Sequence, residues 1–264
     1  MTNGKHFNPG LEITMQKDPL GFTYGKNCFG PEPEQRKLDD IRKSLMDPSC
    51  EGPEIVYSIG MDVGKEKDAA TLYKLHLLFG VVAYASGRLG QEPIRSQGHI
   101  HKPSEYANGW STPELYEVWR GEAIIYMQEF SEQNPGRCFA VRASPGETVI
   151  VPPGWAHCTI SASPTEPLLF GAWCDRDYGF IYDPVRKRKG LAWYPVLSDA
   201  KSIAWNFNTN YIGGELIEKT PRAYKEFDIF DSDPIYRQFE SNPRKFIFIS
   251  RPDLFAEKWT AFVP

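Results

Sequence analysis

The stretch GETVIVPPGWAH, residues 146–157, predicts a β-strand, a tight Pro-Gly turn and a returning strand that carries His157. Other segments have the same character, because each is short, rich in β-branched or aromatic residues and bounded by turn formers. The full set of predicted strands covers residues 54–61, 71–85, 114–130, 138–143, 147–151, 155–162 and 167–173. Strands at this close spacing indicate a sandwich or barrel, so the predicted fold class is mostly β.

Turn residues and helical spacing mark the exceptions to this pattern. Arg120-Gly121-Glu122 predicts a hairpin within residues 114–130, and Asn134-Pro135-Gly136 predicts the next turn. From Glu32 to Met46, apolar residues recur at helical spacing, which indicates one amphipathic helix. Asp233 followed by Pro234 predicts the start of a short helix.

The chain is predicted to have three parts. Residues 1–48 form an N-terminal arm and helix, residues 49–185 the barrel, and residues 186–264 an elaboration packed on it. The elaboration is expected to be structural, because its apolar patches need burial and it contains no histidine or cysteine from Gly190 onward. The basic run at 186–189 is interpreted as a solvated loop and not as a phosphate patch, since the chain is acidic overall.

Composition excludes several classes of protein. The 264 residues include 30 Lys and Arg against 34 Asp and Glu, without the positive excess of a nucleic-acid binder. The longest apolar run, residues 77–85, is too short to cross a bilayer, and residues 1–10 lack the apolar core of a secretory signal. Five scattered cysteines argue against a disulfide framework. The sequence therefore predicts a cytoplasmic protein that binds neither nucleic acid nor membrane.

Three histidines and one glutamate carry the chemistry. His99 and His101 stand at i and i+2, which places both imidazoles on one face of a strand. Glu114 shares a strand face with Tyr116, and His157 comes from the returning strand described above. Three imidazoles and a carboxylate suit a divalent ion such as iron, manganese, nickel, zinc or cobalt, and they leave positions open for substrate oxygens.

These clusters resemble the paired motifs of the cupin superfamily and, within it, the archaeal-type glucose-6-phosphate isomerases. The motifs are PEIVY (53–57), SGRLGQE (86–92), RSQGHIH (95–101), ELY (114–116), VPPGWAH (151–157) and DYG (177–179). The resemblance covers roughly residues 35–180 and does not reach the C-terminal quarter. It implies a double-stranded β-helix, or jelly-roll barrel, as the fold.

The resemblance also implies roles for individual residues. One divalent metal ion per chain would be held by His99, His101, Glu114 and His157. The catalytic residues would be Glu114 and Tyr116, and the sugar phosphate would contact Tyr57, Ser96, Gly98 and Tyr178. Iron is one of the metals implied, and a homodimer is the implied assembly.

The implied reaction is the reversible isomerisation of glucose 6-phosphate and fructose 6-phosphate, a step of glycolysis and gluconeogenesis. Glu114 is expected to transfer a proton through a cis-enediol. A direct hydride shift between C1 and C2 is the competing route. The phosphate group is expected to be required, because remote binding energy can orient the reacting end of the sugar.

The sequence offers three candidates for the carboxylate ligand. Twelve residues separate His101 from Glu114, more than in the family, so Glu105 and Glu117 stay open as alternatives. Glu117 points to the opposite strand face from Glu114. The downstream Gly121 and the accompanying tyrosine favour Glu114.

Three further positions depart from the family pattern. Val82 stands where the family has a hydroxyl near the phosphate, Arg176 replaces a histidine, and Trp173 replaces a tyrosine. These changes leave the metal chemistry intact but leave the identity of the sugar open. Two other functions therefore stay open as well: a metal-dependent cupin dioxygenase, and a cupin that binds a sugar phosphate without turning it over.

Several other residues have a structural interpretation. His76, within an apolar segment predicted as strand, and His6, in the N-terminal arm, are expected to be structural or solvated. Cys158 follows the third histidine on the opposite strand face and is expected to be packed and unreactive. Tyr57 and Tyr178 fit the role of core aromatic residues as well as that of substrate ligands.

Overall fold

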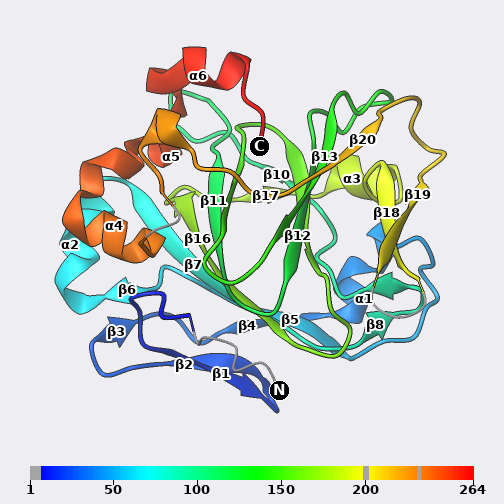
Figure 1. Cartoon of the computed structure of the whole chain (residues 1–264), viewed down its shortest axis with the longest axis horizontal. Coiled ribbons are helices and arrows are strands. Elements are labelled where there is room, and N and C mark those ends of the chain that lie inside the picture. Colours follow the sequence, from blue (N-terminus) through cyan, green and yellow to red (C-terminus); the bar gives the residue numbers. More distant parts are fainter. Residues whose placement is uncertain (1–6, 199–201, 231–232) are drawn as a thin grey trace.

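The computed structural model describes residues 7–198, 202–230 and 233–264 of the chain, so His6 lies outside the described residues. Two β-sheets face each other and enclose the core (Figure 1). In spatial order, the larger sheet consists of β14 (Thr148–Val151), β11 (Glu114–Arg120), β16 (Leu168–Asp175), β7 (Leu77–Tyr84), β5 (Ile55–Met61) and β4 (Glu34–Lys37). The smaller consists of β15 (Ala156–Ser161), β12 (Ala123–Gln128), β13 (Cys138–Ala143) and β20 (Leu216–Lys219). All neighbours are antiparallel except β13 and β20.

Shorter elements surround the two sheets. Two-stranded pairs are formed by β1 (Ile13–Lys17) with β2 (Leu20–Tyr24), β3 (Cys28–Phe29) with β6 (Gly64–Lys65), β8 (Arg88–Leu89) with β9 (Glu92–Pro93), β10 (Ile100–His101) with β17 (Phe180–Ile181), and β18 (Trp193–Leu197) with β19 (Ile203–Phe207). The helices are α1 (Leu38–Ile41), α2 (Ala69–Lys74), α3 (Asp183–Lys187), α4 (Ile235–Ser241), α5 (Ile247–Ser250) and α6 (Ala256–Thr260). Among the described residues, no helix combines the length and the apolar character needed to span a bilayer.

Side chains along β7 alternate between the two faces of the larger sheet. Leu78, Val82 and Tyr84 belong to the apolar cluster between the sheets, which also contains residues of β12 and β13. Phe79 and Val81 belong to a separate cluster on the outer face. Every residue of β7 is therefore buried, and the strand is apolar on both faces.

The C-terminal helices cover the outer face of the larger sheet. Figure 1 shows α4 and α5 beside β16 and β7, and their aromatic residues share one cluster with these strands. The ring of Trp173 on β16 lies 4.7 Å from Phe239 and 5.6 Å from Tyr236, centroid to centroid. Phe246 and Phe248 are fully buried in the same layer. The predicted boundaries after residues 48 and 185 stay predictions.

The predicted hairpin at residues 120–122 is wrong, although the turn itself exists. β11 pairs with β14 and β16 in the larger sheet, whereas β12 pairs with β13 and β15 in the smaller one. The chain therefore crosses between sheets at Gly121, where φ is +76° and a Cβ atom would lie 2.7 Å from the carbonyl oxygen of Pro167. Only glycine fits this backbone conformation and this close approach. The second predicted turn, at 134–136, does connect the paired strands β12 and β13.

Two further element predictions need correction. The helix predicted over residues 32–46 begins as the edge strand β4, and only α1 and a 3-10 turn at 42–44 follow it. Residues 71–85 are not one strand, because α2 occupies the first part and buries Leu72, and β7 begins only at Leu77. Short apolar segments fit both helical and strand periods, which explains this error. The helix predicted to start at Asp233 is α4, which begins at Ile235 after Pro234.

Candidate metal centre

Backbone pairing brings the two histidine motifs together. The N–H of His99 donates to the carbonyl of His157 at 3.0 Å, and the N–H of His157 donates back to the carbonyl of His99 at 2.9 Å. His101 lies two residues further, on β10, where it pairs with Phe180 of β17. The centroids of the three imidazole rings lie 4.3, 5.0 and 5.2 Å apart. The strand register thus gathers three imidazoles from two distant segments at one point.

Two of these rings are oriented by backbone carbonyls. Nδ1 of His101 lies 2.9 Å from the carbonyl oxygen of Thr112, and Nδ1 of His157 lies 3.0 Å from that of Trp155. A neutral ring in this position keeps its hydrogen on Nδ1 and turns the lone pair of Nε2 inward. This is the arrangement by which metal-binding histidines are usually held.

Glu114, the first residue of β11, completes the cluster. Its Oε2 lies 3.1 Å from Nε2 of His101 and 3.3 Å from Nε2 of His157. The hydroxyl of Tyr116 donates to the same oxygen at 2.7 Å, as expected from two residues on one strand face. One ligand atom from each of His99, His101, Glu114 and His157 lies within 4.8 Å of the others.

The cluster fits a divalent cation. Nε2 of His99 and Nε2 of His101 are buried and have no hydrogen-bond partner within the described part of the chain. Inward lone pairs facing a carboxylate oxygen repel one another unless a positive charge lies among them. Three imidazole nitrogens and one carboxylate oxygen are a suitable donor set for a borderline metal ion.

The ionisation of the cluster suits metal binding. Burial lowers the pKa of His99 well below its ordinary value, and the nearby His157 and His101 lower it further, so this ring is neutral. Burial alone would raise the pKa of Glu114, but the adjacent imidazoles of His101 and His157 outweigh it and hold the pKa well below the usual range. Burial raises the pKa of Tyr116, and Glu114 raises it further. The phenol thus remains a hydrogen-bond donor to an ionised carboxylate.

The two alternative carboxylates lie elsewhere. Glu105 is exposed on the loop between β10 and β11. Glu117 is buried on the outer sheet face, where its carboxylate accepts from Nε1 of Trp119 at 2.9 Å and from the N–H of Ile235 at 2.8 Å. Of the three carboxylates left open by the sequence, Glu114 is the one beside the histidines.

Comparison with known proteins places this site in a family. The profile described as glucose-6-phosphate isomerase matches residues 36–212, which is more than half of the chain and includes all four ligands. The chain belongs to the glucose-6-phosphate isomerase family. The histidine–glutamate cluster and the two facing antiparallel sheets identify it as a cupin-type member with a jelly-roll barrel, which confirms the predicted family and fold class.

Individual relatives are distant in sequence, but the aligned region covers most of the length of each relative. Glucose-6-phosphate isomerase of Pyrococcus abyssi is 27% identical over 66% of this chain and 88% of its own. That of Thermococcus onnurineus is 28% identical over 60% of this chain and 76% of its own. Among solved structures, hazelnut vicilin has a TM-score of 0.36 at 13% identity, over 50% of this chain and 33% of its own, a likeness too low to support any inference.

A small cavity of about 50 Å³ opens onto the metal centre between the sheets of this family member. His99, Glu114 and Tyr116 line it, so two of the predicted ligands and the predicted catalytic pair share one space. The ring of Phe180 on β17 lies 4.4 Å from the ring of His99 and closes one side. Ligand pockets for small molecules usually measure at least about 300 Å³, so a hexose phosphate needs more room than this conformation offers.

The predicted substrate residues are divided between this cavity and its surroundings. Tyr57 and Ser96 line the cavity, and Ser96 Oγ accepts from the N–H of Thr159 at 3.1 Å. Gly98 lies outside the lining, with φ +90° and with Leu191 3.0 Å from where its Cβ would be. Tyr178 also lies outside, with 45% of its surface exposed.

The three departures from the family pattern have different surroundings. Val82 lines the cavity, so an apolar side chain does stand beside the substrate space. Trp173 points the other way, into the outer aromatic layer. Arg176 donates to both carboxylate oxygens of Asp62, at 2.9 and 2.7 Å. Cys158 is packed on the outer face of the smaller sheet, where burial raises the pKa of its thiol to about 12.

Sequence reasoning missed two arginines at the cavity rim. Arg186 donates to Oε1 of Gln97 at 2.8 Å and lies over the ring of Tyr182 at 4.9 Å, and both partners line the cavity. Arg36 lies near the hydroxyls of Tyr57 and Tyr182. Burial raises the pKa of Tyr182, and the two guanidinium groups oppose that rise. The basic run at 186–189 is therefore not wholly a solvated loop.

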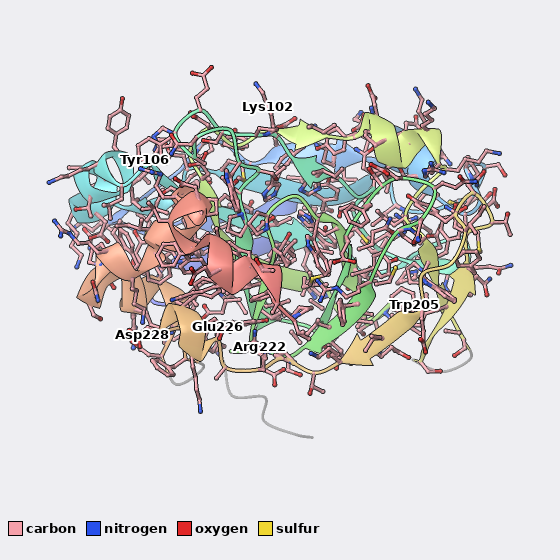
Figure 2. The ribbon with its side chains drawn as sticks, turned by 90° about the horizontal axis from the view of Figure 1, so that it is seen from above. Lys102, Tyr106, Trp205, Arg222, Glu226 and Asp228 are labelled. Carbon is pink, nitrogen blue, oxygen red and sulfur yellow. The ribbon has the colours of Figure 1, made fainter. Side chains whose placement is uncertain are left out.

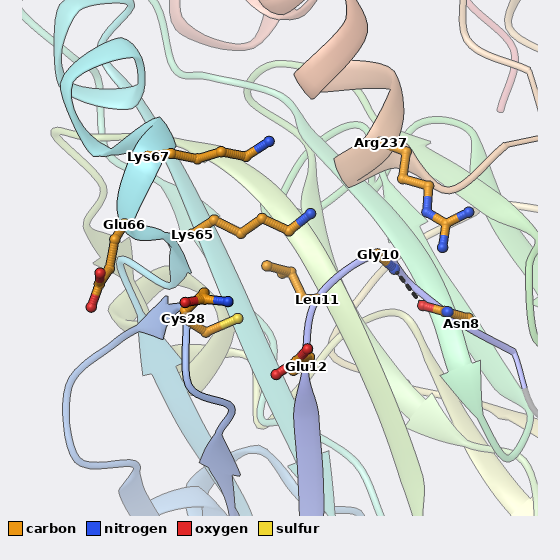
Figure 3. Close-up of a pocket in the computed structure, with 10 residues that line it drawn as sticks. Asn8, Gly10, Leu11, Glu12, Cys28, Lys65, Glu66, Lys67 and Arg237 are labelled. Atoms are coloured by element: carbon orange, nitrogen blue, oxygen red, sulfur yellow. Dashed lines mark hydrogen bonds between the residues drawn. The ribbon is translucent and has the colours of Figure 1, made fainter.

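A larger hollow of about 620 Å³ lies apart from the metal centre, beneath the N-terminal arm (Figure 3). Lys65, Lys67 and Arg237 line it together with Glu12 and Glu66. Its two lysines both pair with Glu240, at 2.7 and 2.8 Å. With Glu240, the hollow has three carboxylates for its three cationic side chains, so its size alone does not make it a rival site for a phosphate.

Proposed function

We propose that this chain interconverts glucose 6-phosphate and fructose 6-phosphate at the metal centre formed by His99, His101, Glu114 and His157. The observation that supports this most is the convergence of these four ligand atoms within 4.8 Å in a member of the isomerase family. A bound divalent ion would polarise the sugar carbonyl and stabilise the oxyanion that develops. Iron, manganese, nickel and zinc all suit the donor set, and a cytoplasmic homodimer is the proposed form.

Glu114 is proposed to move the proton between C1 and C2 of the sugar. An aldose–ketose isomerisation needs a base that removes a proton from one carbon and returns it to the next. The ionised carboxylate of Glu114 faces the cavity, and the Tyr116 hydroxyl 2.7 Å away holds one of its oxygens in place. Tyr116 thus fixes the direction from which Glu114 approaches the sugar.

The phosphate is proposed to bind at the rim, between Arg36 and Arg186. Both guanidinium groups lie next to cavity-lining side chains, and guanidinium recognises phosphate in a bidentate manner. Arg36 also pairs with Glu34 at 2.6 Å, so a phosphate would have to share or replace that partner. Ser96 contributes a hydroxyl further inside. This arrangement would supply the anion recognition that Val82 does not. Entry of the sugar would require Phe180 to move off the ring of His99.

The reaction is tested by a coupled assay on fructose 6-phosphate, with protein reconstituted with one divalent ion at a time. Turnover is expected with deuterium from D₂O in the product, and Glu114→Gln should abolish turnover while keeping the fold. The exposed Glu105→Gln is the matched control and should behave like the wild type. Absence of label together with an active Glu114→Gln variant would favour the hydride shift. Oxygen consumption without isomerisation would indicate the dioxygenase instead.

The phosphate site is tested separately. Arg36→Gln and Arg186→Gln should each raise KM for fructose 6-phosphate by about tenfold, the loss of one charge-assisted hydrogen bond. Arg188→Gln is the matched control from the same basic run, because Arg188 donates to the carbonyls of Ser131 and Asn210 instead. An unchanged KM in both rim variants would remove these arginines from the site.

A further inference from the structure

A second group of ligand-type side chains lies at the adjacent ends of β7 and β16, outside the metal centre. His76 precedes β7, Asp175 ends β16, and Asp177 follows two residues later. The strand register places Leu77 opposite Asp175, which brings the histidine beside both carboxylates. One ligand atom from each of the three residues lies within 4.8 Å of the other two.

Two buried polar atoms in this group have no partner. Asp175 is 1% exposed, and its Oδ1 accepts no hydrogen bond from the described residues. Nε2 of His76 lies 3.0 Å from Oδ1 of Asp177, a contact that is an ion pair only when the imidazole is protonated, and it forms no hydrogen bond with any described residue. Buried polar atoms are nearly always paired, so an unpaired nitrogen beside an unpaired oxygen indicates a missing ligand.

The charge of the group is also unbalanced. Within the described ranges, neither Asp175 nor Asp177 forms an ion pair with a lysine or arginine. Arg176 lies between them in sequence, but its Nη1 and Nη2 donate to Asp62 and to the carbonyl of Leu77, and its Nε has no hydrogen-bond partner among the described residues. Two carboxylates and one imidazole without a cationic partner favour the binding of a cation.

The metal centre shows the same signature. Of the seven buried side-chain atoms without a partner in the described chain, four belong to these two histidine–carboxylate groups. They are Nε2 of His99 and His101 in the metal centre, and Nε2 of His76 with Oδ1 of Asp175 in the second group. Unpaired buried ligand atoms support a bound cation in the metal centre, and the same observation supports a cation in the second group.

The second group joins two loops near the metal centre. Ser104 donates to Oδ2 of Asp177 at 3.3 Å, and the ring of Tyr106 stacks on His76 at 4.2 Å. Figure 2 shows Tyr106 beside α2, on the same edge of the molecule as Lys102. The N–H of Lys102, next to His101, donates to the carbonyl of Gly179 at 2.8 Å. An ion here would fasten the loop after His101 to the segment that follows β16.

We propose that His76, Asp175 and Asp177 form a second divalent-metal site with a structural role. One imidazole nitrogen and two carboxylate oxygens suit zinc or manganese, with water or the Ser104 hydroxyl as a further ligand. The site goes beyond the isomerase reaction and does not depend on it. It raises the number of bound ions from the one expected from the sequence to two per chain.

The test counts zinc in the full chain after chelator treatment, reloading with Zn²⁺ and gel filtration. The wild type should hold two ions per chain. A His99→Ala/His157→Ala variant, which lacks the first site, should hold one, and Asp175→Asn or His76→Asn should also hold one. Asparagine tolerates the left-handed conformation at position 76, where φ is +55°, so His76→Asn keeps the backbone. Glu105→Gln, an exposed acid on the neighbouring loop, is the control and should hold two.

A second readout excludes adventitious zinc. In the variant without the first site, added Zn²⁺ should raise Tm, because an ion that binds the folded state stabilises it. Adding Asp175→Asn to that variant should abolish the rise. A wild type with one ion per chain, or a rise in Tm that survives Asp175→Asn, would overturn the proposal.

Discussion

The two faces of the larger sheet differ in what they carry. The inner face presents Glu114 and Tyr116 to a narrow, largely apolar cavity shared with His99. The outer face of the same strands is packed with aromatic side chains, among them Trp173 beneath Phe239. Neighbouring residues in one strand are therefore expected to serve catalysis on the inner face and stability on the outer face. Along each strand, substitutions at inward-facing positions should therefore change metal content and activity. Substitutions at the alternate, outward-facing positions should change the free energy of unfolding.

Strand β11 shows how the two faces are connected. Glu114 and Tyr116 point inward, while Glu117 points outward and accepts a hydrogen bond from the N–H of Ile235 at the start of α4. The C-terminal segment thus contacts the outer face of the strand that supplies the predicted metal-binding carboxylate. Damage to the outer face should lower stability first, and should affect the metal centre only when the strand itself moves.

The largest expected effect is on the inner face. His157→Ala should lose the metal of the main site and at least about 10²-fold of kcat, because it removes one of the three imidazole ligands that lie beside the Glu114 carboxylate. Far-UV circular dichroism should be unchanged. Cys158→Ala is the matched control, since that side chain is next in sequence but on the opposite face. Equal metal loss in both variants, measured by elemental analysis, would contradict the separation of faces.

The next effect belongs to the outer face. Phe239→Ala should lower the free energy of unfolding by about 3–5 kcal/mol, the usual cost of deleting a buried aromatic ring. Phe239 is fully buried and packs on Trp173. Urea unfolding measures the loss, and the metal content per folded chain should stay at the wild-type value. Loss of metal before unfolding would show that the faces are coupled more tightly than we expect.

A smaller effect is expected from one hydroxyl group. Tyr116→Phe should lower kcat by about tenfold and leave the metal content unchanged, because the hydrogen bond to Glu114 is worth roughly 1.5–3 kcal/mol when its acceptor is charged. The comparison of kcat with KM distinguishes positioning of Glu114 from binding of the sugar. A rise in KM with kcat unchanged would assign Tyr116 to substrate binding.

The smallest effect on stability should come from an exposed residue at the edge of the outer aromatic layer. Leu254→Ala should change the free energy of unfolding by no more than about 0.5 kcal/mol, because 63% of Leu254 is exposed. The same urea titration used for Phe239→Ala measures it. A loss above 1 kcal/mol would mean that Leu254 is covered in solution, for example by a second copy of the chain.

The metal centre could be predicted from the sequence because the strand period of two determines it. His99 and His101 fall on one face, and alternation separates Glu114 from Glu117. The sheet face on which Trp173 lies could not be predicted in this way. Its strand, LLFGAWCD, is buried on both faces and shows no alternation from which the inner face could be read.

Other features depend on contacts between distant segments. Gly121 marks a turn, but turn chemistry does not specify which strands pair on either side, so the crossing between sheets was predicted as a hairpin. Arg36 and Arg186 lie on either side of the predicted barrel segment in sequence, and both approach Tyr182 in the structure. No motif around either arginine indicates a place near the cavity. The second histidine–carboxylate group likewise requires the pairing of β7 with β16.

The hydrogen bond between Glu117 and Ile235 has a consequence for how the protein is made. Synthesis delivers the chain from its N-terminus, so β11 leaves the ribosome long before α4 does. Until then the buried carboxylate lacks this donor, and the outer residues of β7, including Phe79 and Val81, are uncovered. Between the synthesis of β16 and that of α4, the nascent chain is therefore expected to expose an apolar sheet face to solvent, a state in which it could aggregate.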